Sequence, residues 1–203
     1  MKIKLLLIIC FLTCQWMSSQ ELFLVSGKNL TSYDYKSANG ASDFNLKSKT
    51  GSYYEFGYEH IFNKKISYIA SITLNQFNSF STNEVKSYSW NTNYLGIQNA
   101  AAYTLFKTEN EIELKLKAGV NIATIIDGKE QINGVIYDVK TEPEFSGIFF
   151  QPLIGLDLRY VITDYVTLSM GYNFSKAFKF SHTTDEKLSF TNNQVQLGIH
   201  FPL

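Results

Sequence analysis

The stretch IELKLKAGVNIATII, residues 112–126, decides the fold of this chain. Its apolar parity holds Ile112, Leu114, Leu116, Ala118, Val120 and Ile122, and its other parity holds Glu113, Lys115, Lys117, Gly119 and Asn121. A period of two is typical of a β-strand with one apolar face, whereas a helix would scatter the three charges among the aliphatic side chains. The stretch is also long enough to cross a bilayer, which takes about 9–11 tilted residues.

The same alternation recurs along the rest of the chain. Further strands are expected at about residues 21–30, 53–62, 66–77, 88–106, 148–162, 166–174 and 194–203. The first of these alternates poorly, and its outward parity stays open. Long polar connections are expected at about 31–50, 78–87, 127–147 and 176–187, and they alternate along the chain with tight turns at 63–65, 107–111 and 163–165.

This arrangement predicts an all-β fold: an eight-stranded antiparallel up-and-down transmembrane β-barrel. Short turns at one end and long external loops at the other are typical of such barrels. Within the connection at 127–147, the segment GVIYDVK (134–140) could extend a hairpin beyond the membrane.

Residues 1–19 have the pattern of a secretory signal peptide. Lys2 and Lys4 precede an apolar run over residues 5–12, and small residues end the segment near Ser19. That run is too short for a membrane-spanning helix, which needs about 20 residues. Any membrane association of the remaining chain is therefore expected to come from strands.

Residues 20–203 are expected to form one transmembrane barrel domain. They retain 16 basic and 18 acidic residues, a net charge of about −2, so no nucleic-acid partner is expected. Both cysteines lie in the predicted signal peptide, which leaves no disulfide or thiol chemistry. No glycine-rich phosphate loop, HExxH motif or nucleophile elbow is present, and neither a cofactor nor a metal site is expected.

Alternation alone does not say which face is inside, because a soluble barrel turns its apolar face inward. Aromatic residues at both strand ends favour the outward orientation, since they are typical of membrane-interface belts. The belt expected at the short-turn end holds Phe62, Tyr103, Phe106, Tyr160, Tyr165 and Phe201. The belt expected at the loop end holds Tyr53, Tyr54, Tyr88, Trp90, Phe149, Phe150, Phe178 and Phe180.

Charges of both signs on the opposite parity support the same orientation. Eight strands leave a bore only wide enough for side chains, so these charges are expected to pair within it and close it. The predicted lumenal charged network holds Glu55, Glu59, Glu113, Lys115, Lys117, Asp157 and Arg159. The predicted lipid-facing set holds Phe56, Tyr58, Ile72, Leu74, Leu114, Leu116, Val120, Leu156, Leu158, Leu168, Met170, Leu197 and Ile199.

The signal segment, the alternating loop lengths, strands such as YYEFGYEHIF (53–62) and the final strand QVQLGIHFPL (194–203) together carry a resemblance. The chain resembles the small eight-stranded outer-membrane β-barrels of Gram-negative bacteria, of the OmpA-transmembrane and OmpX type. The resemblance implies a multi-pass protein of the cell outer membrane, surrounded by its lipid. It also implies that the barrel-assembly machinery recognises the final strand, although here Pro202 and Leu203 follow the aromatic Phe201.

The leading hypothesis is a non-enzymatic protein with a structural or surface-interaction role, whose four external loops could meet an extracellular ligand or surface partner. One alternative is a soluble secreted or periplasmic lipocalin-like barrel that binds an apolar ligand. Another is an outer-membrane lipid-modifying enzyme, for which His182 is the candidate, although the adjacent Ser181 would point the other way on a strand. A conducting pore is a further option.

Two further groups of residues are candidates for chemistry. The loop acids Asp127, Glu130, Asp138, Glu142 and Glu144 could form a calcium site, although solvated loop acids are the commoner case. His60 is interpreted as a belt residue, and His200 as a lumenal or turn-end polar residue.

Overall fold

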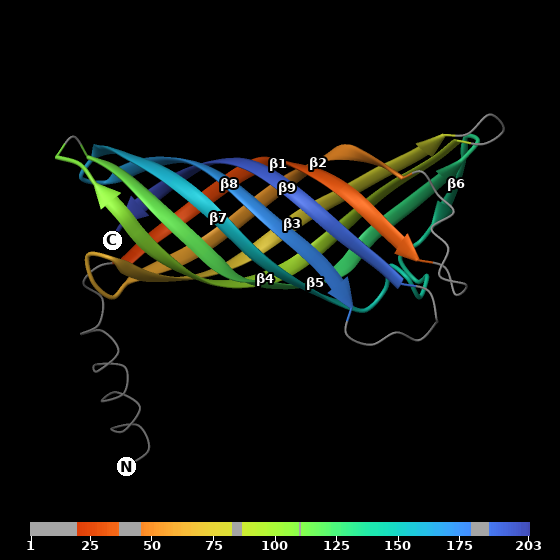
Figure 1. Cartoon of the computed structure of the whole chain (residues 1–203), viewed down its shortest axis with the longest axis horizontal. Helices are drawn as coiled ribbons and strands as arrows, with labels where there is room; N and C mark the ends of the chain where they lie inside the picture. The colour runs from red at the N-terminus through yellow and green to blue at the C-terminus, as the bar shows by residue number, and fades with distance from the viewer. Residues whose placement is uncertain (1–19, 37–45, 83–86, 110, 180–186) are drawn as a thin grey trace, which may run out of the picture.

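The computed structural model describes residues 20–36, 46–82, 87–109, 111–179 and 187–203. They form a barrel, seen from the side in Figure 1. The long strands are β1 (Gln20–Lys36), β2 (Lys47–Ile61), β3 (Ile66–Thr82), β4 (Ser87–Lys107), β5 (Ile112–Ile132), β7 (Ile148–Thr163), β8 (Val166–Lys179) and β9 (Lys187–Pro202). A short strand, β6 (Val135–Asp138), pairs with the end of β5.

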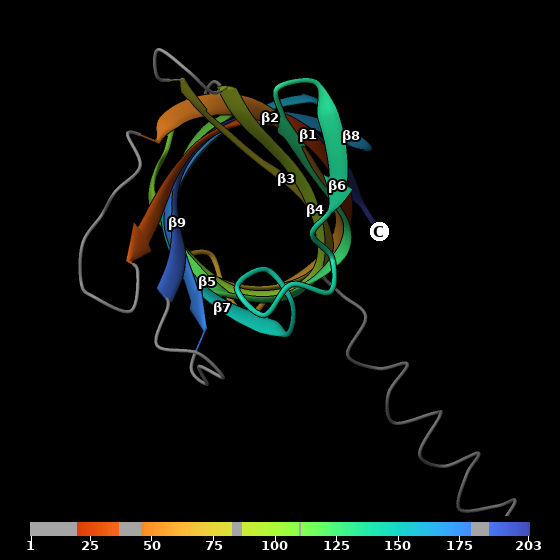
Figure 2. The ribbon, with the colours of Figure 1, turned by 90° about the vertical axis from the view of Figure 1, so that its right-hand side faces the viewer.

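Antiparallel pairing runs around the whole circumference. The sheet order is β4-β3-β2-β1-β9-β8-β7-β5, and β4 also pairs with β5, which closes the ring seen end-on in Figure 2. β1 and β9 pair from Glu21 and Pro202 to Lys36 and Lys187. The predicted eight-stranded antiparallel barrel is therefore confirmed. No helix among the described residues is long and apolar enough to cross a membrane.

The three tight turns are confirmed at one end of the barrel. They separate Ile61 from Ile66, Lys107 from Ile112, and Thr163 from Val166. This end lies on the left in Figure 1, where the chain end at Leu203 also lies. It is called the short-turn end below, and the opposite end is called the loop end.

The long connections between strands are shorter in the structure than the sequence predicted. β1 continues to Lys36, and β3 and β4 pair as far as Thr82 and Ser87, leaving only residues 83–86 between them. The predicted extension after β5 is confirmed as a hairpin whose turn, Asn133 and Gly134, has positive φ at both residues. The polar composition of these segments was misleading because a strand that projects into water carries polar side chains on both faces.

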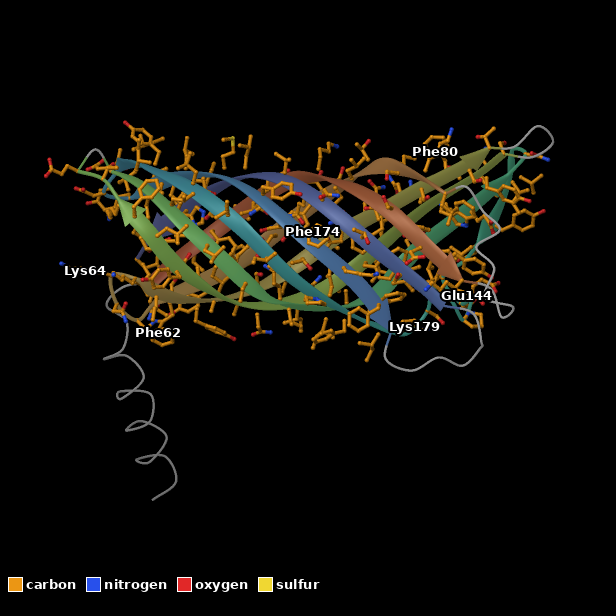
Figure 3. All side chains as sticks on the ribbon, viewed as in Figure 1. Phe62, Lys64, Phe80, Glu144, Phe174 and Lys179 are labelled. Atoms are coloured by element: carbon orange, nitrogen blue, oxygen red, sulfur yellow. The ribbon has the colours of Figure 1, made fainter. Side chains whose placement is uncertain are left out.

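Over the middle of the barrel, the long strands other than β1 turn their apolar parity outward and their polar parity inward. All the predicted lipid-facing residues lie on the outer parity, where Leu197 is 64% and Phe56 54% exposed. Figure 3 shows side chains projecting from the whole circumference of the barrel. The predicted short-turn belt is also exposed, from 40% at Phe201 to 75% at Tyr165.

Some outward positions are polar, and they are hydrogen-bonded to each other. Asn99 interrupts the apolar face of β4, and its side-chain oxygen accepts a hydrogen bond from the hydroxyl of Tyr68. Nearer the loop end, a row of cross-strand bonds interrupts the apolar band on β1 to β5: Lys28 to Ser52 (3.1 Å), Gln76 to Asn91 (2.9 Å) and Asn93 to Asp127 (3.2 Å).

Candidate functional site

An ionic network fills the lumen at the short-turn end. At its centre, Arg159 Nη2 lies 2.6 Å from Glu59 Oε2, and Nη1 lies 2.9 Å from Glu21 Oε2. Arg159 Nε also lies 2.8 Å from Asp157 Oδ2. The second carboxylate oxygen of Glu59 is 2.8 Å from Lys115 Nζ. The network thus connects β1, β2, β5 and β7 across the bore.

A second buried carboxylate, that of Glu55, lies deeper in the lumen. It accepts hydrogen bonds from the side chains of Tyr53 (2.6 Å), Ser71 (2.6 Å) and Gln98 (2.7 Å). Lys117 Nζ lies 4.0 Å from it. Glu55 is therefore held mainly by neutral donors, unlike Glu59.

The structure places all seven predicted lumenal charges on the inward parity. Glu113 is the least buried of them, with its side chain 17% exposed, and it accepts a hydrogen bond of 2.6 Å from Thr104. Sequence reasoning missed Glu21 as a member of the network because the parity of the first strand was open. His200 is lumenal and 2% exposed.

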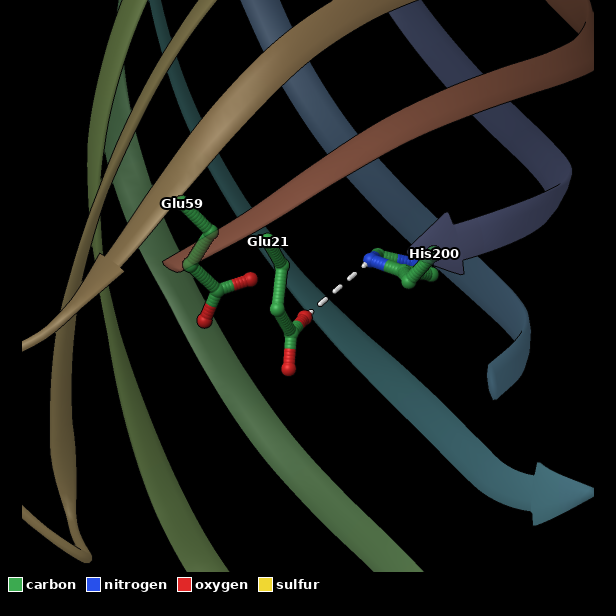
Figure 4. Close-up of side chains that lie close together, drawn as sticks. All are labelled: Glu21, Glu59 and His200. Carbon is green, nitrogen blue, oxygen red and sulfur yellow. Dashed lines mark ion pairs between the residues drawn. The ribbon is translucent and has the colours of Figure 1, made fainter. Parts of the chain in front are cut away.

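His200, Glu21 and Ser169 lie together at the edge of the network (Figure 4 shows the first two with Glu59). His200 Nε2 is 2.9 Å from Ser169 Oγ, and Nδ1 is 3.6 Å from Glu21 Oε2. Among the described residues, Glu21, Glu59 and His200 are the one group whose ligand atoms converge closely enough to hold a metal ion, within 4.8 Å. Arg159 already supplies positive charge to both carboxylates, so this group is better described as part of the ionic network.

Between the ionic network and the loop end, amide and hydroxyl side chains inside the lumen bond mostly between neighbouring strands. The contacts are Thr73 to Asn121 (3.2 Å), Asn121 to Gln151 (3.0 Å), Gln151 to Ser175 (2.8 Å), Asn29 to Asn75 (3.3 Å), Thr31 to Asn192 (3.0 Å) and Asn173 to Gln196 (3.1 Å). Most of these groups are hydrogen-bonded to one another, although the side-chain oxygen of Asn173 has no partner among the described residues, so the middle of the barrel is a polar layer.

At the loop end the lumen is filled by aromatic rings. Phe190 is fully buried, and its ring centroid lies 4.7 Å from that of Tyr33, 5.2 Å from Phe149, 5.3 Å from Phe77 and 5.7 Å from Tyr94. This aromatic plug includes Tyr33, Phe77, Trp90, Tyr94, Phe145, Phe149 and Phe190. It closes the bore from the loop end, as the ionic network does from the short-turn end.

The plug corrects the predicted loop-end belt. Tyr53, Trp90 and Phe149 were expected to face the interface, but they are 1%, 8% and 1% exposed and point inward. Tyr54 faces outward and is 55% exposed, while Phe150 and Phe178 form a cross-strand aromatic pair with ring centroids 5.8 Å apart. Phe180 lies outside the described residues. Strand parity, and not ring chemistry, decides which aromatics face in.

The connection after β6 folds inward over the plug. Val139 and Phe145 are 2% and 9% exposed, and the hydroxyl of Tyr94 donates a hydrogen bond of 3.3 Å to the carbonyl oxygen of Phe145. Lys179 Nζ donates to the carbonyl oxygen of Pro143 at 2.6 Å. In Figure 3, Glu144 and Lys179 are both labelled at this end.

The structure tests one of the two other predicted chemical sites. The loop acids Asp127, Glu130, Asp138, Glu142 and Glu144 do not converge as a metal-ligand group in the part of the chain that the structure describes. His182 and Ser181 lie outside the described residues. His60 packs against the ring of Phe62, with centroids 4.9 Å apart, near the short-turn end.

Comparison with known proteins supports the fold. No family model and no curated protein matches the sequence. The outer membrane protein OprG from Pseudomonas aeruginosa matches with a TM-score of 0.53 and 12% identity, over 93% of this chain and 98% of that chain. The N-terminal β-barrel domain of Pseudomonas aeruginosa OprF matches with a TM-score of 0.50 and 11% identity, over 92% and 98%. At these identities the likeness shows a shared barrel fold.

Proposed function

We propose that this protein is an integral, multi-pass protein of the Gram-negative outer membrane, with a structural or surface-interaction role exercised through its loop end. The observation that carries the proposal is the distribution of polarity. Large apolar side chains are exposed on every long strand, while Arg159 and Lys115 are each 3% exposed inside. In water, so large a continuous apolar surface would drive aggregation; in a bilayer it is the required surface.

The same observation argues against the soluble lipocalin-like alternative. Such a barrel would place its apolar parity inside and leave a cavity for an apolar ligand. Here the lumen contains ion pairs, amides and an aromatic plug. The likeness of fold to OprG and the OprF barrel supports the outer-membrane location.

A blocked lumen supports a role other than conduction. Ions that entered from the short-turn end would meet Arg159 and Glu59, 2.6 Å apart, and those that entered from the loop end would meet the buried ring of Phe190. Buried side chains thus occupy the lumen near both ends. The protein is therefore proposed to act as a scaffold that presents the loop end.

Assembly of such a barrel would depend on its last strand. β9 pairs with both β8 and β1, so it completes the ring. We propose that the barrel-assembly machinery recognises β9, which carries the outward alternation Val195, Leu197, Ile199 and Phe201.

Cell fractionation tests the location. The protein is expected in the outer-membrane fraction, extracted only by detergent, with a gel mobility that changes on boiling because the barrel unfolds. Recovery in the soluble periplasmic or secreted fraction would overturn the proposal. In planar bilayers, the refolded protein is expected to give no current steps, and regular steps would overturn the scaffold role while leaving the location intact.

One observation favours a second candidate function, serine hydrolysis. Ser169, His200 and Glu21 lie in the order of a nucleophile, a base and an orienting carboxylate, with separations of 2.9 and 3.6 Å. Among the residues described, the cavity of about 570 Å³ at the short-turn end is lined by Glu21 and Arg159 without Ser169 or His200, whereas Ser169 lines a separate cavity of about 890 Å³. Labelling of Ser169 by a fluorophosphonate, absent in Ser169→Ala, would support the enzyme; no labelling of the folded barrel would remove it.

A further inference from the structure

A cavity of about 390 Å³ opens at the loop end, above the aromatic plug. It lies between the plug, the segment after β6 and the ends of β1, β5 and β9. Its aromatic and aliphatic walls come from Tyr33, Tyr35, Leu46, Trp90, Ile132, Tyr137, Val139, Phe145 and Leu188. This mouth pocket is distinct from the ionic network, and its volume is in the range of small-molecule sites, about 300–1,000 Å³.

Four carboxylates complete the lining: Glu130, Asp138, Glu142 and Glu144. No lysine or arginine is among the described lining residues. The pocket therefore combines π-faces with a concentration of negative charge.

Glu130 is the carboxylate most closely tied to the aromatic wall. It stands opposite Trp90 in the β4–β5 pairing, and the two side chains are hydrogen-bonded, with the indole N–H as donor. Burial, together with the neighbouring charge of Glu142, raises the pKa of the Glu130 carboxyl. Both effects disfavour the ionised form of the Glu130 carboxyl. A cation bound beside it would stabilise that form.

One described cation near the pocket, Lys179, has other partners. Lys179 lies close enough to Glu144 for an electrostatic interaction, but its Nζ donates to the carbonyl oxygen of Pro143 and lies 5.8 Å from the centre of the Phe149 ring. Among the described residues, no ion pair within 4.0 Å involves Glu130, Asp138 or Glu142. Lys129 stands opposite Asp138 in the β5–β6 pairing without a salt bridge to it, so no described ion pair within 4.0 Å balances the charge of these three carboxylates.

This chemistry selects its ligand. Aromatic faces attract weakly hydrated cations and apolar groups, and carboxylates attract ammonium or guanidinium. A small inorganic cation would gain little from the rings, and an anion would be repelled by the acids. A ligand that uses both components is a cation attached to an apolar body.

We propose that the mouth pocket binds a small organic cation, an ammonium or guanidinium on an apolar or aromatic body, with the charge among Glu130, Glu142 and Asp138 and the body against Trp90 and Tyr137. This rests on the proposed function only in that the loop end is taken to meet solutes outside the cell. The site names a ligand class for that surface.

Tryptophan fluorescence offers a direct test. The chain has two tryptophans, and in the full chain with Trp16→Phe, Trp90 is the only one. The barrel, folded in detergent and verified by its heat-modifiable mobility, would be titrated with phenethylammonium, with the neutral 2-phenylethanol, with the anionic 3-phenylpropionate and with Ca²⁺. Saturable quenching or a spectral shift is expected for phenethylammonium, with affinity at least about fivefold weaker for the other three.

Matched variants locate the site. Glu130→Gln and Glu142→Gln keep the shape and remove a charge, and each is expected to weaken phenethylammonium binding at least about fivefold. Glu109→Gln, in the exposed β4–β5 turn at the opposite end, is the control and should change nothing. Tyr137→Ala removes a 51% exposed ring and should weaken both phenethylammonium and 2-phenylethanol.

Three outcomes would overturn the proposal. One is equal affinity for phenethylammonium and 2-phenylethanol, which would make the pocket merely apolar. Another is tighter binding of Ca²⁺ than of phenethylammonium, which would make it an inorganic-cation site. The third is the absence of saturable binding by a barrel that passes the mobility test, and this would leave the proposed outer-membrane function untouched.

Discussion

Arg159 Nη2 lies 2.6 Å from Glu59 Oε2 inside the barrel, and this contact joins β7 to β2 across the lumen. Both side chains are almost fully buried, at 3% and 0% exposure. Removing Arg159 would leave Glu59 with Lys115 as its remaining ion-pair partner and would take the ion-pair partner from Asp157, so buried negative charge would lose most of its compensation.

Arg159→Met is therefore expected to lower the free energy of unfolding by about 3–5 kcal/mol. Urea unfolding of the barrel in detergent, followed by gel mobility, measures this. The double variant Arg159→Met with Glu59→Gln should regain part of the loss because one of the buried carboxylate charges that Arg159 balanced is gone. If the double variant were as unstable as the sum of both single variants, the pair would not act as a unit.

A single charged substitution tests whether the outward-facing residues lie against lipid. Leu156 is 44% exposed on the outer face of β7 and pairs with Leu116. In a bilayer, Leu156→Arg should lower the free energy of unfolding by about 2–4 kcal/mol if the position is near the midplane. Thr82→Arg, exposed at the loop end of β3, is the control. Equal stability of the two variants in lipid vesicles would contradict a lipid-facing Leu156.

The aromatic plug should contribute strongly to stability. Phe190→Ala removes a fully buried ring from contact with four others, and the expected loss is about 3–5 kcal/mol. Phe174→Ala removes an outward ring, 43% exposed, and should cost less. Urea unfolding in detergent compares them, and a larger effect at Phe174 would mean that the plug is loosely packed.

Ionisation of Glu130 is expected to lower the free energy of unfolding as the pH rises. Burial first, and then the charge of Glu142, raise the pKa of its carboxyl above the ordinary value of 4.5, so the folded state holds the proton more tightly than the unfolded state. The resulting stabilisation is present below pH 4.5 and is lost as the pH rises through the raised pKa. Glu130→Gln should flatten this part of the profile, measured by urea unfolding between about pH 4 and 7. An unchanged profile would contradict the shift.

The fold could be predicted because alternation is strong where one face meets hydrocarbon. Between Ile112 and Ile122 each apolar residue has a polar or small neighbour, and the structure keeps that parity. The alternation did not predict the orientation of β1, where Phe23 and Val25 point inward while Ser26 and Lys28 point outward. Both faces of that strand mix polar and apolar residues, so period alone could not orient it.

The candidate site was less predictable for two physical reasons. Which lumenal charges meet depends on strand tilt and register, so the convergence of Glu21 from β1 on Arg159 from β7 has no local signature. In addition, an aromatic residue at a strand end serves equally well as an interface anchor or as a plug. Tyr54 lies outside the barrel and Tyr53 lies inside it only because neighbouring residues of a strand point to opposite faces.

The pairing of β1 with β9 has a consequence for biogenesis. Leu24 meets Ile199, a partner about 175 positions later in the chain, so this seam cannot form until the last strand has been synthesised. Bringing such distant segments together costs chain entropy before any contact rewards it, which makes seam formation intrinsically slow. Until then, both strands keep a row of unpaired amides and carbonyls, and the nascent chain would need an escort that shields these edges from other copies.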